Sequence, residues 1–193
     1  MGESGKRTKG RFALRKEVAV KPLAGKKILM VIAHKDFRDE EYREPRKVLE
    51  DAGAQITVAS SSMNACKGML GMQVKPDLLY TDARAGDYDA VVFVGGYGAQ
   101  EYWEDPKAHG VARDADKAGK IVSAICIAPV ILANAGLLEG KEATVWPSES
   151  GQIEGKGARY RKAGVVRDGR FVTADGPESA SAFGKKLVEA LGS

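Results

Sequence analysis

The stretch KIVSAICIAPVILANAG, residues 120–136, decides the fold class of this chain. It opens as a short apolar run, 120–126, of the kind that forms a strand buried on both faces of a parallel sheet. It passes without a linker into a helical pattern, 127–136, that ends at Gly136. A strand that turns directly into a helix at a cysteine is typical of a nucleophile elbow, so Cys126 is expected to project at the carboxyl edge of the sheet.

Strand and helix patterns alternate on both sides of this stretch. We expect strands at 27–34, 55–61, 89–96 and 143–146, helices at 39–53, 105–119 and 178–191, and a hairpin over 165–174 that turns at Asp168-Gly169. Residues 62–88 predict a small hairpin or loop and a short helical turn. The alternation predicts an α/β fold of the flavodoxin-like type, with a parallel sheet sandwiched between helices.

Positive charge is concentrated at the N-terminus of the 193-residue chain. Residues 1–27 hold nine Lys or Arg and two Glu, whereas the rest of the chain holds 21 bases and 24 acids. We therefore divide the chain into a basic extension, 1–26, and one α/β domain, 27–193. The extension either contacts nucleic acid or an acidic partner, or packs on its own domain or a neighbouring subunit. Its single aromatic residue favours the second interpretation, because base stacking needs aromatic side chains.

The remaining composition argues against several classes of protein and of site. No apolar run reaches the roughly 18 residues of a membrane span, and no signal-peptide pattern opens the chain, so a cytoplasmic location without a membrane partner is expected. With two cysteines and two histidines we expect no metal site, and we expect no cofactor. Cys66 is either a loop thiol or a second redox site, and the first is favoured. His109 is expected to face solvent, whereas His34 ends the first strand and either reaches the pocket or lies in a surface loop.

The surroundings of Cys126 predict a reactive thiol. Free N–H groups at the start of the following helix, beginning with Ile127, are expected to lower the pKa of the thiol and to bind an oxyanion. The pair Gly95-Gly96 ends a neighbouring strand, so its backbone should approach a ligand closely. The alternative is that Cys126 is a small buried apolar residue, and its place in the pattern favours the reactive thiol.

From about Lys27 to Leu191 the chain resembles the ThiJ/PfpI superfamily, which includes PfpI-type intracellular proteases, glyoxalase III-like enzymes and the parkinsonism-associated deglycase. The resemblance rests on DFRDEEYREP (36–45), DAVVFVGGYGAQ (89–100), SAICIAPVILANAGLL (123–138) and DGRFVTADGPESASAFGKKLVEAL (168–191). It implies that Cys126 is an oxidation-sensitive nucleophile and that Glu41, in protonated form, donates a hydrogen bond to its sulfur. It also implies that Gly96 and Ile127 bind an oxyanion, that Gly176-Pro177 lies near the pocket, and that the protein is a homo-oligomer.

Three positions depart from the family pattern. Ile127 stands where PfpI-type proteases carry a histidine, and Trp146 stands where other relatives carry one. Gln100 aligns with the glutamate that a neighbouring subunit supplies in the proteases, although Glu101 is next to it. A thiol without a base loses a factor of about 10² to 10⁴ in proton-transfer catalysis.

Three functions follow from these observations. The first is an enzyme for small reactive carbonyl compounds, of the glyoxalase III or deglycase type, which would use Cys126 and Glu41. The second is a redox-sensing or stress-protective protein whose Cys126 is oxidised. The third is a PfpI-type cysteine peptidase or amidase, which Ile127 disfavours.

Overall fold

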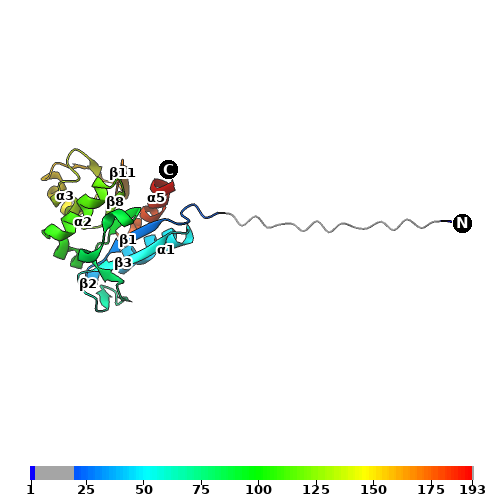
Figure 1. Cartoon of the computed structure of the whole chain (residues 1–193). Helices are drawn as coiled ribbons and strands as arrows, with labels where there is room; N and C mark the ends of the chain where they lie inside the picture. The colour runs from blue at the N-terminus through cyan, green and yellow to red at the C-terminus, as the bar shows by residue number, and fades with distance from the viewer. Residues whose placement is uncertain (3–19, 193) are drawn as a thin grey trace.

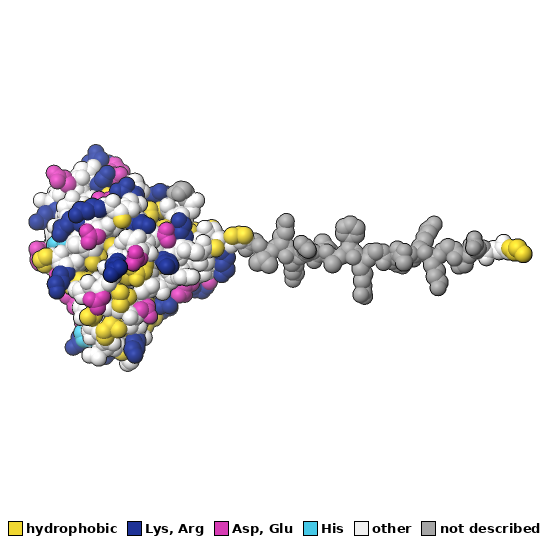
Figure 2. Space-filling model, viewed as in Figure 1, with side chains coloured by type: hydrophobic (Ala, Val, Ile, Leu, Met, Phe, Trp, Pro, Cys, Tyr) yellow, Lys and Arg dark blue, Asp and Glu magenta, His cyan; other side chains and the backbone are white. Residues whose placement is uncertain are grey.

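The computed structural model describes residues 1–2 and 20–192, and the second range forms an α/β domain with a covered central sheet (Figure 1). Most of the basic extension predicted over 1–26 lies outside the described residues. Of its described part, Leu23 is buried and donates its N–H to the carbonyl of Ala52 at 2.9 Å. Basic and acidic side chains intermingle on the face of the domain seen in Figure 2.

The central sheet has seven strands in the order β11-β12-β8-β7-β1-β3-β6. They are β1 (Lys27–Val31), β3 (Gln55–Ser60), β6 (Leu78–Leu79), β7 (Ala90–Phe93), β8 (Ile121–Ile125), β11 (Val165–Asp168) and β12 (Phe171–Ala174). All neighbours run parallel except β11, which joins β12 in an antiparallel hairpin. β7, β8 and β12 are buried throughout, in keeping with their mostly apolar sequences.

Helices cover both faces of this sheet (Figure 1). They are α1 (Asp39–Asp51), α2 (Pro106–Lys117), α3 (Pro129–Asn134), α4 (Ser150–Glu154) and α5 (Ala180–Gly192). α1 packs against α5, and a Cβ at Gly184 would lie 2.9 Å from the Cα of Pro45, so glycine is needed for this close approach. α2 packs against α3 on the other face. The predicted α/β fold, a mostly parallel sheet between helices, is confirmed.

A second sheet, of three short strands, stands beside the first. It consists of β2 (Lys35–Phe37), β4 (Cys66–Gly68) and β5 (Gln73–Val74), and β4 and β5 form the hairpin expected within 62–88. Asp39, in the first turn of α1, accepts hydrogen bonds from the N–H groups of Leu70 and Met72 at 2.9 and 2.8 Å. These bonds tie the turn of the hairpin, and Met69 with it, to the start of α1.

Several helices and strands differ in extent from those predicted from the sequence. The run 27–34 ends as a strand at Val31, and the chain then turns into β2 of the second sheet. The helix predicted from residue 127 begins at Pro129, because residues 126–128 form the turn. The strand predicted at 143–146 is reduced to β9 (Glu142–Ala143), which pairs with β10 (Arg159–Tyr160). Short 3₁₀ turns, η1 (Tyr80–Asp82), η2 (Ala85–Asp87), η3 (Tyr97–Tyr102), η4 (Pro147–Glu149) and η5 (Pro177–Ser179), connect the rest.

Candidate functional site

Cys126 occupies the turn between β8 and α3 in a left-handed backbone conformation, with φ of 64°. A residue with a Cβ is held in this region only at a cost of about 1–3 kcal/mol, so its surroundings must fix it there. The Cys126 N–H donates to the carbonyl of Ala174 at 2.9 Å, and the Cys126 carbonyl accepts from the N–H of Trp146 at 2.7 Å. Hydrogen bonds to segments far along the chain therefore hold the thiol in place.

The loop after β7 lies against this turn because β7 and β8 are parallel neighbours, with Phe93 opposite Ala124. A Cβ at Gly95 would lie 2.5 Å from the Cβ of Cys126 and would overlap the Glu41 carboxyl. Gly96 has φ of 97°, which favours glycine. The N–H groups of Gly96 and Ile127 face the Cys126 sulfur and favour its charged form. The structure thus brings together Cys126, Gly95, Gly96 and Ile127.

Glu41 reaches the same point from the first turn of α1 and is fully buried, with 0% of its surface exposed. Burial raises its pKa from 4.5 to about 8, although Cys126, Arg38 and the N–H of Gly95 pull the pKa downward. Within the described residues, neither carboxyl oxygen has a hydrogen bond of good geometry. Glu41 is therefore mostly protonated at neutral pH, as a donor to sulfur or to a bound carbonyl must be.

The pKa of the Cys126 thiol is raised, which corrects the expectation of a lowered value. Burial is the main cause, since only 9% of the residue is exposed, and the Glu41 carboxyl adds to the effect once it is ionised. The N–H groups of Gly96 and Ile127 oppose it in part. The prediction was wrong because it left out the burial of the sulfur, which outweighs the two N–H groups.

A cavity of about 230 Å³ opens onto the sulfur. Its lining consists of Arg38, Glu41, Met69, Gly96, Tyr97, Gln100, Cys126, Ile127, Trp146, Ser148, Glu149 and Pro177. The predicted residue Gly176 lies behind Trp146, because a Cβ there would be 2.8 Å from the indole ring. The indole remains 44% exposed. This cavity is the candidate active site.

The sequence did not single out the lining residues Arg38, Met69, Ser148 and Glu149. Ser148 and Glu149 lie two and three residues after Trp146 in the chain, and this closeness is the signal that could have found them. Arg38 precedes α1 and binds Glu40 through Nε and one terminal nitrogen, at 2.8 and 3.1 Å. Met69 carries no such signal, since contacts between distant segments position it. Its N–H donates to the carbonyl of Phe37 at 2.9 Å, and Asp39 accepts hydrogen bonds from Leu70 and Met72 in the same hairpin turn.

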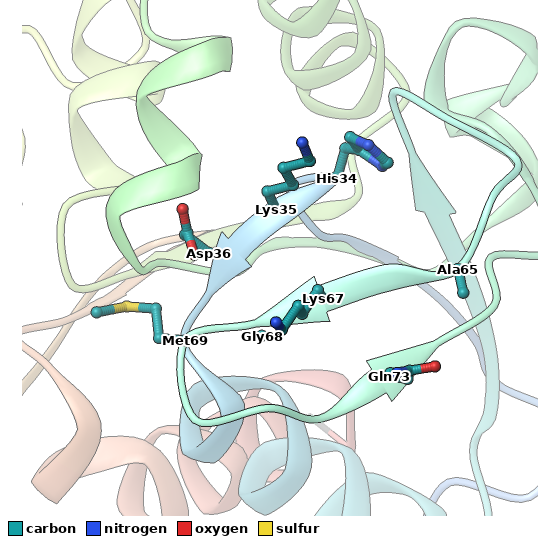
Figure 3. Close-up of a pocket in the computed structure, with 8 residues that line it drawn as sticks. All are labelled: His34, Lys35, Asp36, Ala65, Lys67, Gly68, Met69 and Gln73. Carbon is teal, nitrogen blue, oxygen red and sulfur yellow. The ribbon is translucent and has the colours of Figure 1, made fainter.

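His34 does not lie in the Cys126 cavity, which corrects one of the two possibilities left open for it. It borders a separate hollow of about 590 Å³ over the second sheet, together with Lys35, Lys67 and Gln73 (Figure 3). The reason is the turn from β1 into β2, where the His34 N–H donates to a carboxylate oxygen of Glu101 at 3.1 Å.

His109 is buried, with 9% of its surface exposed, so the expectation that it faces solvent was wrong. Its Nε2 lies 2.7 Å from the carbonyl of Trp103, a partner that the helical pattern alone does not disclose. Cys66 lies buried in β4, and its thiol donates to the hydroxyl of Ser60 at 3.2 Å. Among the described residues, no three His, Cys, Asp or Glu side chains gather as metal ligands. In that part of the chain, no helix is long and apolar enough to cross a bilayer.

The fold and the turn at Cys126 define an α/β protein with a cysteine at the carboxyl edge of a parallel sheet. A family model described as the DJ-1/PfpI family matches residues 26–190. This chain belongs to the DJ-1/PfpI family, and the resemblance seen in the sequence is confirmed.

Individual relatives agree with this assignment. An uncharacterized protein of Methanocaldococcus jannaschii is 43% identical over 168 residues, which cover 86% of this chain and 82% of the relative. A Pyrococcus horikoshii protein named deglycase is 31% identical over 165 residues, which cover 86% and 99%. The crystal structure of a ThiJ/PfpI domain protein from Brachyspira murdochii superposes with a TM-score of 0.84 at 37% identity, covering 86% of this chain and 98% of that one.

Proposed function

We propose that this protein converts small reactive carbonyl compounds, such as 2-oxoaldehydes, by covalent catalysis at Cys126 with Glu41 as the proton-transfer group. The observation that carries the proposal is the placement of a rigidly held thiol beside a buried, protonated carboxyl and two backbone N–H donors in one cavity. The name of the Pyrococcus horikoshii relative, deglycase, points to chemistry of the same class.

The first step joins the Cys126 sulfur to the aldehyde carbon. A carboxylic acid can accept the S–H proton on one oxygen while its own O–H proton passes to the carbonyl oxygen, so Glu41 ends the step as it began. The carbonyl oxygen becomes a hydroxyl group, and the product is a hemithioacetal. The N–H groups of Gly96 and Ile127 support the negative charge that grows on this oxygen. No free thiolate has to accumulate, which suits a thiol whose pKa burial raises.

The two other functions are less well supported. Peptide hydrolysis needs a group that protonates the leaving amine, and no histidine lies among the described residues of the cavity lining. A redox sensor needs a thiolate, because the thiolate is the species that oxidants attack. The raised pKa of Cys126 works against that requirement.

The proposal is tested by the turnover of methylglyoxal with the purified protein and three variants. Cys126→Ala and Glu41→Gln are expected to abolish turnover. Cys66→Ala is the matched control, since Cys66 is the other cysteine and lies outside the cavity lining, and it should keep the activity. Turnover that survives in Cys126→Ala, or no turnover by the unmodified protein, would refute the proposal.

A further inference from the structure

A second carboxyl group borders the Cys126 cavity, on the segment that follows Trp146. Glu149 is part of the cavity lining, and its N–H donates to the carbonyl of Trp146 at 2.8 Å. The N–H of Trp146 donates in turn to the carbonyl of Cys126 at 2.7 Å. Two consecutive backbone hydrogen bonds therefore connect Glu149 to the turn that carries the thiol.

The carboxylate of Glu149 is oriented by hydrogen bonds to both of its oxygens. The hydroxyl of Ser148 donates to one oxygen at 2.7 Å, and the side-chain amide of Gln152 donates to the other. Glu149 is half-buried, in contrast to the fully buried Glu41. The cavity thus has one carboxyl shielded from water and one in contact with it.

The chemistry after the hemithioacetal requires a group that accepts a proton from carbon. The other polar side chains of the described lining, apart from Cys126 and Glu41, are Arg38, Tyr97, Gln100, Ser148 and Trp146, whose indole N–H can only donate. A guanidinium has no free site for a proton, and a phenol, an amide and an alcohol are poor bases at neutral pH. Glu41 is mostly protonated there, because its pKa is about 8. Glu149 is the remaining candidate.

We propose that Glu149 is the catalytic base that moves the carbon-bound proton of the Cys126 hemithioacetal, an inference that rests on the proposed function. Glu149 removes the hydrogen of the carbon bonded to sulfur, and the electron pair forms a double bond to the adjacent ketone carbon. The ketone oxygen takes a proton from Glu41, which gives an enediol. Protonated Glu149 then returns its proton to the former ketone carbon, and the hydroxyl next to sulfur gives its proton back to Glu41. The product is a thioester on Cys126, which water hydrolyses to a 2-hydroxy acid and the free thiol.

The experiment separates addition to sulfur from proton transfer at carbon. Addition is measured by the methylglyoxal concentration that half-protects Cys126 from iodoacetamide, and proton transfer by kcat and by deuterium incorporation at the hydroxyl-bearing carbon of the product in D₂O. In Glu149→Gln we expect unchanged protection, a kcat lower by about 10² to 10⁴-fold, and loss of the deuterated product. Glu154→Gln, on α4 and outside the lining, is the matched control and should behave as the unmodified protein.

Each other outcome counts against the assignment. If Glu149→Gln keeps kcat and deuterium incorporation, another group is the base. If protection and kcat fall together, Glu149 supports the shape of the cavity and is no base. If the unmodified protein is neither protected by methylglyoxal nor turns it over, the proposed function itself fails, and the role of Glu149 fails with it.

Discussion

Replacing Glu41 by glutamine should change how the stability of the protein depends on pH. Glutamine has nearly the same shape as the protonated carboxyl and carries no charge at any pH. In the unfolded chain Glu41 has its ordinary pKa of 4.5, and in the folded protein burial raises the pKa to about 8. The folded state therefore resists an ionisation that the unfolded state undergoes freely.

The size of the effect follows from the two pKa values. A difference of about 3.5 units corresponds to about 5 kcal/mol, at 1.36 kcal/mol per unit. Because the folded pKa is the higher one, the contribution is fully present below about pH 4.5 and is lost as the pH rises through about 8. Over this window the free energy of unfolding should fall by about 1.4 kcal/mol per pH unit because of Glu41 alone.

The assay is urea unfolding of the unmodified protein and Glu41→Gln at several pH values between about 5 and 8. The difference between the two free energies of unfolding cancels groups that titrate alike in both proteins. We expect Glu41→Gln to gain about 4 kcal/mol relative to the unmodified protein across this range. Cys126→Ala should keep most of the slope, since burial, and not the thiol, is the main cause of the raised pKa. Parallel pH profiles for the unmodified protein and Glu41→Gln would refute the reasoning.

Three further predictions concern the frame of the cavity and the thiol. Gly95→Ala should lower the free energy of unfolding by about 1–3 kcal/mol in urea titrations, because the new Cβ would press on Cys126 and Glu41. The control is Gly110→Ala in α2, where the Cβ meets open space, and it should raise the free energy of unfolding slightly. Equal effects of the two substitutions would contradict the contact at Gly95. Asp39→Asn should cost about 1–3 kcal/mol and speed amide hydrogen exchange at Leu70 and Met72, and unchanged exchange would mean that other contacts hold the hairpin. The rate at which iodoacetamide alkylates Cys126 should be lower than the rate for glutathione at neutral pH, and it should still increase with pH above about pH 9. A rate that reaches its plateau below that pH would indicate a lowered pKa of the thiol.

Local sequence patterns were sufficient for six of the seven strands of the central sheet, all except β6, and for part of the site. Strands β7 and β8 are mostly apolar runs that lie just before Gly95 and Cys126, and parallel neighbours end at the same edge of a sheet. The proximity of Gly95 and Cys126 therefore followed once β7 and β8 were taken as neighbouring parallel strands. Glu41 was located only through the family pattern, because an acidic residue in the first turn of a helix is equally common on a surface.

The sequence by itself determined which backbone segments meet at the edge of the sheet, because strand periodicity and glycine positions are local properties. The tertiary structure alone decided the neighbours and the ionisation of the thiol. It placed His34 at another hollow through the turn into β2, and it brought Met69 to the cavity through hydrogen bonds from distant segments. It also reversed the expected direction of the Cys126 pKa. Burial is the sum of everything packed around a group, and no stretch of sequence around that group contains this sum.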